Sequence, residues 1–127
     1  MNVNSVGWFE IYVEDMKRAR SFYEEVLGKK IEPMKTPDMG AGFEMCAFPG
    51  SMENYGANGA LVRMPGFPTG KNSVLIYFSC DDCANEESRV VAHGGKVEKS
   101  KFSIGEYGYI ALAYDTEGNM FGLHSMK

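Results

Sequence analysis

The sequence predicts an α+β fold built from two consecutive copies of one β-α-β-β-β unit. A strand-like segment over Trp8–Val13 precedes a helical segment that ends near Gly28. Roughly 67 residues later, a second strand-like segment over Ser73–Cys80 precedes a helical segment that ends near Gly94, and such a repeat indicates internal pseudo-symmetry. Each half is too small to bury its own apolar face, so the halves are expected to pack together and to leave a ligand groove between them.

Length and composition restrict the class of protein. The 127 residues are 44% hydrophobic and 13% aromatic, which suits one globular domain with a substantial core. The net charge is -4 and the lysines and arginines are scattered, so neither nucleic acid nor a membrane is an expected partner. The first residues show no signal-peptide pattern and no apolar run is long enough to span a bilayer, so a cytoplasmic location is expected. The odd number of cysteines, three, then indicates reduced thiols.

The first half starts with a strand whose two faces differ. Alternation places its side chains in two opposite sets: Phe9, Ile11 and Val13 on one side, and Trp8, Glu10 and Tyr12 on the other. Asp15 fits the N-cap of the following helix and Gly28 fits its C-terminal end. Apolar residues at helical spacing from Met16 to Leu27 predict an amphipathic helix over one face of the sheet. Further strands are expected at residues 30–35, 43–48 and 60–64.

The second half repeats this order after a linker. Residues 65–72 contain two prolines and two glycines without periodicity, so the expected modules of this single domain are about 5–64 and 73–126. The second module is predicted to contain a strand, a helix and three more strands, at residues 73–80, 82–93, 96–102, 109–114 and 120–126. The last two strands are joined by a turn over residues 115–119.

Several motifs together resemble one known superfamily. They are Phe9-Glu10-Ile11-Tyr12-Val13 leading to Asp15, Arg18-Ala19-Arg20-Ser21-Phe22-Tyr23, Val26-Leu27-Gly28, Asp115-Thr116-Glu117-Gly118-Asn119 and Gly122-Leu123-His124. The chain thereby resembles the vicinal oxygen chelate superfamily, which includes glyoxalases, bleomycin-resistance proteins and ring-cleaving dioxygenases, and in particular proteins related to lactoylglutathione lyase. The resemblance implies a cupped mixed sheet around a cavity, helices on the outside, and completion of the cavity in a homodimer.

The same resemblance identifies the positions at which a metal would be bound. They fall at Trp8 and Leu75 on the first strands, at Gly122 on the last strand and at or near Gly59. An indole offers only an N–H donor, and leucine and glycine side chains offer no lone pair, whereas a divalent cation needs several N, O or S ligands. The usual metal site is therefore predicted to be absent, and neither a metal nor another cofactor is expected.

Strand alternation predicts that four polar side chains face one apolar cavity: Glu10, Arg63, Tyr77 and His124, with Leu61 and Ser79 on the same side. In a reaction, Glu10 or His124 could act as general base, while Tyr77 or Arg63 could stabilise developing negative charge. The alternative is structural, with an ion pair between Glu10 and Arg63 and a half-buried His124.

Aromatic side chains could line the same cavity. Trp8, Phe43 and Tyr109 are the candidates for stacking on a planar ligand, although aromatic residues on strands are more often part of the core. Loops at residues 52–56 and 105–108 could form its rim. Cys80 and Cys83 have the spacing of a redox pair, but the acidic residues between them disfavour a thiolate and indicate structural cysteines.

Two functions are compatible with these features. The leading hypothesis is a metal-independent protein that binds a small molecule at the module or dimer interface. The alternative is a glyoxalase-like lyase or isomerase acting next to a carbonyl, either without a metal or with a divalent metal held by non-standard ligands such as Glu10 and His124. A third possibility is a subunit without a ligand of its own that pairs with another protein.

Overall fold

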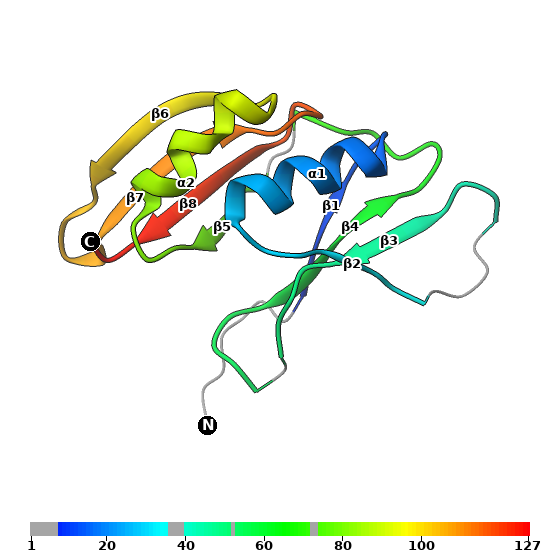
Figure 1. Ribbon diagram of the computed structural model, residues 1–127, viewed down its shortest axis with the longest axis horizontal. Coiled ribbons are helices and arrows are strands. Elements are labelled where there is room, and N and C mark those ends of the chain that lie inside the picture. Colours follow the sequence, from blue (N-terminus) through cyan, green and yellow to red (C-terminus); the bar gives the residue numbers. More distant parts are fainter. Residues whose placement is uncertain (1–7, 36–39, 52, 72–73) are drawn as a thin grey trace.

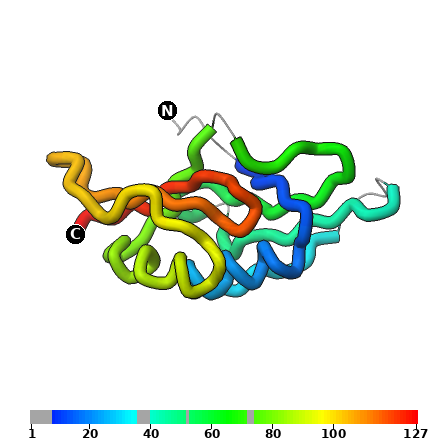
Figure 2. The backbone as a smooth tube through the Cα atoms, turned by 90° about the horizontal axis from the view of Figure 1, so that it is seen from above, coloured from blue at the N-terminus to red at the C-terminus, as the bar shows by residue number. Residues whose placement is uncertain are grey.

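The computed structural model describes residues 8–35, 40–51, 53–71 and 74–127. In these residues the strands form two four-stranded sheets, with the orders β1-β4-β3-β2 and β5-β8-β7-β6 (Figure 1). In each sheet one pairing is parallel, β1 with β4 and β5 with β8, and the others are antiparallel. Both α-helices lie on the same side of the sheets (Figure 2). The predicted α+β fold with two tandem modules is confirmed.

The elements follow the predicted order with modest differences in their ends. They are β1 (Trp8–Tyr12), α1 (Met16–Leu27), β2 (Glu32–Pro33), β3 (Glu44–Ala47), β4 (Asn58–Arg63), β5 (Ile76–Ser79), α2 (Cys83–Val90), η1 (Val91–His93), β6 (Lys96–Ser103), η2 (Gly105–Tyr107), β7 (Tyr109–Tyr114) and β8 (Met120–Ser125). The second predicted helix is shorter than expected, because its last turn is a 3-10 turn. None of the helices in the described ranges is long and apolar enough to cross a membrane.

Side chains at the helix ends explain where each helix begins. The Asp15 carboxylate accepts a hydrogen bond from the backbone N–H of Arg18 at 3.0 Å, and Asp82 caps α2 by accepting from the N–H of Ala84 at 3.0 Å. Gly28 ends α1 with a φ of 67°, a left-handed conformation that glycine adopts without strain. The predicted caps of α1 are therefore present, and they fix the helix over the sheets.

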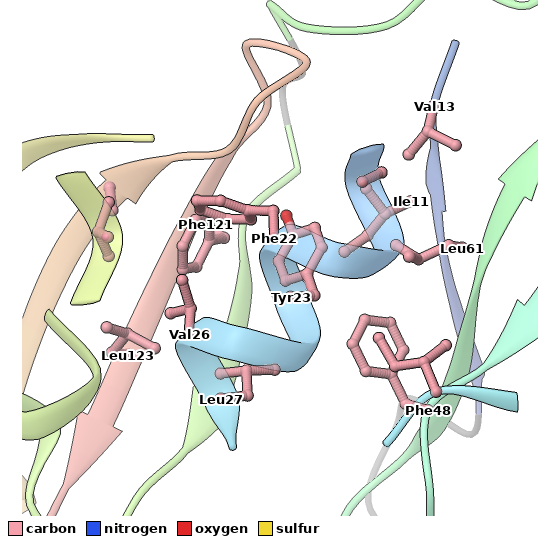
Figure 3. Close-up of a cluster of buried hydrophobic side chains, with 14 of the residues drawn as sticks. Ile11, Val13, Phe22, Tyr23, Val26, Leu27, Phe48, Leu61, Phe121 and Leu123 are labelled. Atoms are coloured by element: carbon pink, nitrogen blue, oxygen red, sulfur yellow. The ribbon is translucent and has the colours of Figure 1, made fainter. Parts of the chain in front are cut away.

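The core is centred on α1, which contacts both modules (Figure 3). Tyr23 and Val26 are fully buried, and Phe22 is almost fully buried. The Tyr23 ring lies 5.8 Å from the ring of Phe48 in the first module and 5.5 Å from the ring of Phe121 in the second, measured between centroids. Helix α1 therefore joins the two halves through a shared apolar core.

A buried polar network also joins the halves. The Tyr23 hydroxyl donates to Asp115 Oδ2 at 2.7 Å, while Asp115 Oδ1 accepts from the backbone N–H groups of Glu117 and Asn119. The Asn119 side-chain amide donates to the backbone carbonyl of Tyr12 on β1 at 3.2 Å. Burial, followed by the charge of Asp115 and its hydrogen bond, raises the pKa of Tyr23 well above its ordinary value. The turn over residues 115–119 thus has a structural role in holding the modules together.

Candidate functional site

The two sheets meet at a seam between their inner strands, β1 and β5. No strand pairing joins these two strands in the part of the chain that the structure describes. On the helix side, the rings of Phe9 and Phe78 close the seam with their centroids 5.9 Å apart. We call the opposite side, which the helices do not cover, the open face; it carries Trp8, Glu10 and Tyr12 from β1, and Tyr77 and His124 from the second module.

The polar group of the first module is a carboxylate held by two aromatic side chains. Trp8 Nε1 donates to Glu10 Oε2 at 3.1 Å, and the Tyr12 hydroxyl donates to Glu10 Oε1 at 2.8 Å. The hydrogen bond to Glu10, with smaller contributions from burial and the carboxylate charge, raises the pKa of Tyr12. Alternate residues of a strand point the same way, which is why these three side chains meet. The result is a carboxylate with a fixed orientation on the open face.

The second module supplies a phenol and an imidazole to the same face. Tyr77 pairs with Gly122, and a Cβ at Gly122 would collide with the Tyr77 ring, so this glycine makes room for the ring. His124 lies beside Ser79, and its Nε2 is 2.7 Å from the backbone carbonyl of Tyr107. A carbonyl oxygen can only accept a hydrogen bond, so Nε2 is the nitrogen that carries the proton and donates. In the neutral ring Nδ1 is then free of a proton and can accept a hydrogen bond.

A cavity of about 480 Å³ lies at one end of the seam. Its walls come from both modules: Tyr77 and Ser79 of β5 on one side, and the loop over residues 49–57 on the other, with Lys29 at the end of α1. Asn54 and Tyr55 of that loop line the cavity, whereas Met52 lies outside the described residues. Clefts of roughly 300–1,000 Å³ with a few polar groups on an apolar wall are typical of small-molecule sites.

The predicted orientation of Leu61 and Arg63 is wrong. The parallel register places Ile11 beside Leu61, and both side chains point into the core (Figure 3), where Leu61 is fully buried. Arg63 donates from Nε to the carbonyl of Glu14 at 2.9 Å and from Nη1 to the carbonyl of Gly42 at 2.6 Å. The odd-numbered residues of β4 thus face the helices, and the Glu10–Arg63 ion pair considered as the structural alternative does not form.

Phe43 and Tyr109 also lie away from the open face. Phe43 and Arg63 line an open groove of about 860 Å³ between α1 and the strands β2 and β3, which we call the outer groove. Tyr109 packs against the hydrophobic core, and Lys101 Nζ lies 4.7 Å from the centroid of its ring. The structure therefore places Trp8, Glu10, Tyr77 and His124 on the same face, the open face, and places Arg63, Phe43 and Tyr109 elsewhere.

The donor set does not fit the metal that the fold would hold. Three of the positions that the resemblance implies are Trp8, Leu75 and Gly122, and the Trp8 N–H already donates to Glu10. The fourth was predicted at or near Gly59, but Gly59 faces the helices against the Phe9 ring and so lies on the opposite side of the sheet from Trp8. Glu10 on β1 and His124 on β8 do not converge, because β5 lies between these strands. Within the described residues, no group of three or more histidine, cysteine, aspartate or glutamate side chains could hold a metal ion.

The three cysteines have the surroundings of structural thiols. Burial, followed by the charge of Glu86, raises the pKa of Cys80 to about 12. Cys46 and Cys83 are buried, and burial also raises the pKa of Cys46. A thiol with a raised pKa is a poor nucleophile, so the geometry agrees with the structural interpretation of Cys80 and Cys83.

Two residues of the candidate site were not identified from the sequence, one on the open face and one at the seam cavity. Phe67, in the linker, stacks on Tyr12 with ring centroids 5.0 Å apart and an interplanar angle of 22°. Lys29 reaches the seam cavity from the end of α1. The available signal for Phe67 was an aromatic residue between Gly66 and Pro68, in a segment that has no core-forming pattern. For Lys29 the sequence contains no comparable signal.

Comparisons with known proteins agree with this architecture. Maize (Zea mays) glyoxalase I, as its E144Q mutant, superposes with a TM-score of 0.72 at 20% identity, over 94% of this chain and 46% of the maize chain. TnmS3, an antibiotic-binding protein from Streptomyces sp. CB03234, superposes with a TM-score of 0.63 at 25% identity, over 98% of each chain. The fosfomycin resistance protein FosX from Listeria monocytogenes superposes with a TM-score of 0.65 at 14% identity, over 98% of this chain and 92% of the FosX chain.

No curated protein sequence matches the chain significantly. The family description "Glyoxalase/Bleomycin resistance protein/Dioxygenase superfamily" matches residues 5–123, which is nearly the whole chain. This match agrees with the two-module architecture and with the motifs on the first strand, the first helix and the late turn. The chain belongs to the glyoxalase/bleomycin resistance protein/dioxygenase superfamily.

Proposed function

We propose that this protein binds a small organic molecule, without a metal ion, at the seam between its two modules. The observation that carries the proposal is the cavity of about 480 Å³ whose walls come from both halves of the chain. Its lining combines the aromatic rings of Tyr55 and Tyr77 with the Ser79 hydroxyl, the Asn54 amide and the Lys29 ammonium group. Aromatic rings supply contact area for a planar ligand, and the few polar groups orient it.

One relative supports a binding function. TnmS3, whose identity of 25% extends over nearly the whole chain, is described as an antibiotic-binding protein. The replaced donor positions support binding without a metal, because the side chains of Trp8, Leu75 and Gly122 offer no lone pair to a cation. In this proposal Tyr77 contacts the flat part of the ligand in the cavity. Trp8, Glu10 and His124, which lie on the open face outside the cavity lining, contact the parts of the ligand that extend over that face.

The exposed aromatic residues support the proposal that a second copy completes the site. Trp8 is 42% exposed and Tyr77 is 46% exposed on the open face. Large apolar side chains gathered on one face are typical of a surface that another molecule covers. We therefore propose a homodimer in which the partner closes the open face over the ligand, and we expect it to act in the cytoplasm.

A thermal-shift screen with planar aromatic and carbonyl compounds tests the proposal. A compound that binds only the folded protein stabilises it by roughly 2.7 kcal/mol at a hundred times its Kd. We expect a hit to lose most of this stabilisation in Tyr77→Ala. The matched control is Tyr107→Ala, since Tyr107 is also exposed but does not line the cavity. Equal loss in both variants, or no hit in the screen, would contradict the proposed site.

The fate of the ligand separates binding from catalysis. We expect the compound to be recovered unchanged after incubation with the protein, as judged by mass spectrometry. If the compound is converted, and Glu10→Gln or His124→Ala abolishes conversion while the fold is retained, the protein is instead a lyase or isomerase. A stoichiometric divalent ion in the carefully purified protein would contradict the metal-independent function.

A further inference from the structure

We propose that a small hollow beside Glu10 binds a positively charged head group of the ligand, an ammonium or quaternary ammonium group. This inference rests on the proposed function, because the head group belongs to the molecule that lies on the open face. It adds a ligand class and a second contact region to the seam cavity described above.

The hollow has a volume of about 140 Å³ and lies between the inner strands, on the side of the seam where β1 ends. Glu10 and Tyr12 form its wall on β1, and Val74 and Ile76 form the facing wall. Pro68 of the linker also borders it. A space of this size accommodates a head group but not a whole drug-sized ligand, which needs roughly 300 Å³ or more.

Glu10 is the one charged side chain among the described residues that line the hollow. Among the described residues, no lysine, arginine or histidine lines it, and none forms an ion pair with Glu10. Arg63, the expected partner, is instead bound to backbone carbonyl groups on the helix side. The Trp8 and Tyr12 hydrogen bonds orient the Glu10 carboxylate, but both donors are neutral and leave its negative charge uncompensated. A cationic group is therefore attracted and an anionic group repelled.

The surroundings of Glu10 favour an organic cation over an inorganic one. Trp8 and Tyr12 flank the carboxylate and hold it through the indole N–H and the phenol O–H, which lie in the planes of the rings. These in-plane donors place ring edges, not ring faces, beside Glu10, so the attraction of a cation comes from the carboxylate. The apolar walls of Val74, Ile76 and Pro68 suit the methyl groups of a quaternary ammonium ion. Phe67, stacked on Tyr12, extends this aromatic wall away from the hollow.

A matched pair of probes tests the inference. Choline and 3,3-dimethylbutan-1-ol have nearly the same shape and differ in the charge of the head group. Trp8 is the only tryptophan of the chain, so its fluorescence and its single indole N–H resonance report directly on the site. We expect choline to shift the Trp8 resonance and to bind about tenfold tighter than the alcohol, as expected for the attraction between a cation and a carboxylate.

Two variants with the same change of charge locate the effect. Glu10→Gln should abolish the preference for choline, whereas Glu98→Gln on β6, at another exposed glutamate, should leave it unchanged. Equal affinity for the two probes, no binding of choline, or an equal effect of both variants would overturn the inference. If neutral planar compounds still stabilise the wild-type protein in the thermal-shift screen, the cation site has failed and the proposed function stands. If they do not, both have failed.

Discussion

The two inner strands occupy equivalent places in their modules but present different chemistry. Glu10 on β1 lies beside Ala60 of the last strand in its module, and Tyr77 on β5 lies beside Gly122 of the last strand in its own. The first module therefore presents a carboxylate between two aromatic side chains, and the second presents a phenol over a glycine. The comparison teaches that a duplicated scaffold can keep its pairing pattern while its two halves acquire different binding groups.

The helices differ in the same way. Helix α1 buries six of its residues and contacts rings from both modules. Helix α2 buries two and packs on α1 and on β6, β7 and β8 of its own module. Because α1 lies toward the centre, it leaves the outer groove above β2 and β3 of the first module. The first module thus contributes the helix at the centre of the shared core, and its outer strands β2 and β3 are covered less by a helix than the strands of the second module.

The largest expected effect on stability comes from removing the central acceptor of the polar network that joins the halves. Asp115→Ala leaves the buried Tyr23 hydroxyl and the backbone N–H groups of Glu117 and Asn119 without their acceptor. We expect a loss of about 3–5 kcal/mol in the free energy of unfolding, measured with urea. Asp81→Ala, at an exposed position, should change it by less than about 0.5 kcal/mol. Similar values for the two variants would show that the network does not hold the modules together.

A pair of glycine variants compares the two sheets directly. A Cβ at Gly59 would collide with the Phe9 ring, which packs against Phe48 and Phe78, whereas a Cβ at Gly122 would collide with the half-exposed Tyr77 ring. We expect Gly59→Ala to cost about 1–3 kcal/mol of stability in urea unfolding, because the core must shift.

The Gly122→Ala variant should cost less stability, because Tyr77 can move into solvent, but it should weaken binding of any screening hit at the seam cavity. Both quantities can be measured on the same samples, by urea unfolding and by thermal shift. A larger stability loss for Gly122→Ala than for Gly59→Ala would contradict the difference in packing between the two faces.

Alkaline pH tests the hydrogen bond between Tyr23 of α1 and Asp115 of the second module, with a smaller expected effect on stability. The pKa of Tyr23 is raised in the folded state, so its contribution is fully present below the unfolded pKa of about 10 and is lost as the pH rises above it. Tyr23→Phe should lose about 1 kcal/mol at neutral pH and show a weaker decline of stability at high pH. Tyr55→Phe, at a side chain that is 90% exposed, should behave as wild type. An unchanged alkaline decline in Tyr23→Phe would contradict this role.

The smallest effect concerns the thiols. Their reactivity is expected to be equally low in the two modules, although their neighbouring residues differ. With the pKa of Cys80 raised to about 12, and with Cys46 and Cys83 buried, iodoacetamide should alkylate the native protein slowly at neutral pH. Mass spectrometry should show no modification under conditions that fully label the urea-unfolded chain. Rapid labelling of Cys80 in the native protein would reopen the possibility of a redox pair.

Most of the fold could be predicted, because its signals are local. The caps Asp15 and Gly28 and the alternation along β1 depend only on neighbouring residues, and each appears in the structure. The shortened α2 shows the limit of these signals, since the turn after Val90 has a helical pattern but forms a 3-10 turn. Local patterns thus fix the order and type of the elements better than their ends.

The site was less predictable, because it depends on how strands align with one another. Glu10, Tyr77 and His124 were placed on the open face from alternation within each strand. Leu61 and Arg63 were placed there too, but the register of β4 against β1 turns them toward the helices. The contact between Phe67 and Tyr12 joins segments 55 positions apart in the chain (67 − 12), so no local pattern could reveal it.

The unpaired seam has a consequence for how the protein can change. Hydrogen-bonded strands keep a fixed spacing of about 4.8 Å, but the described parts of β1 and β5 are not paired across the seam. Their separation is set by side chains such as Phe9 and Phe78, which meet through their rings. Substitution of one such ring by a smaller or larger side chain can change the distance between β1 and β5, while the hydrogen bonds within each sheet stay intact. The architecture can therefore adapt to ligands of different size at the seam through single substitutions.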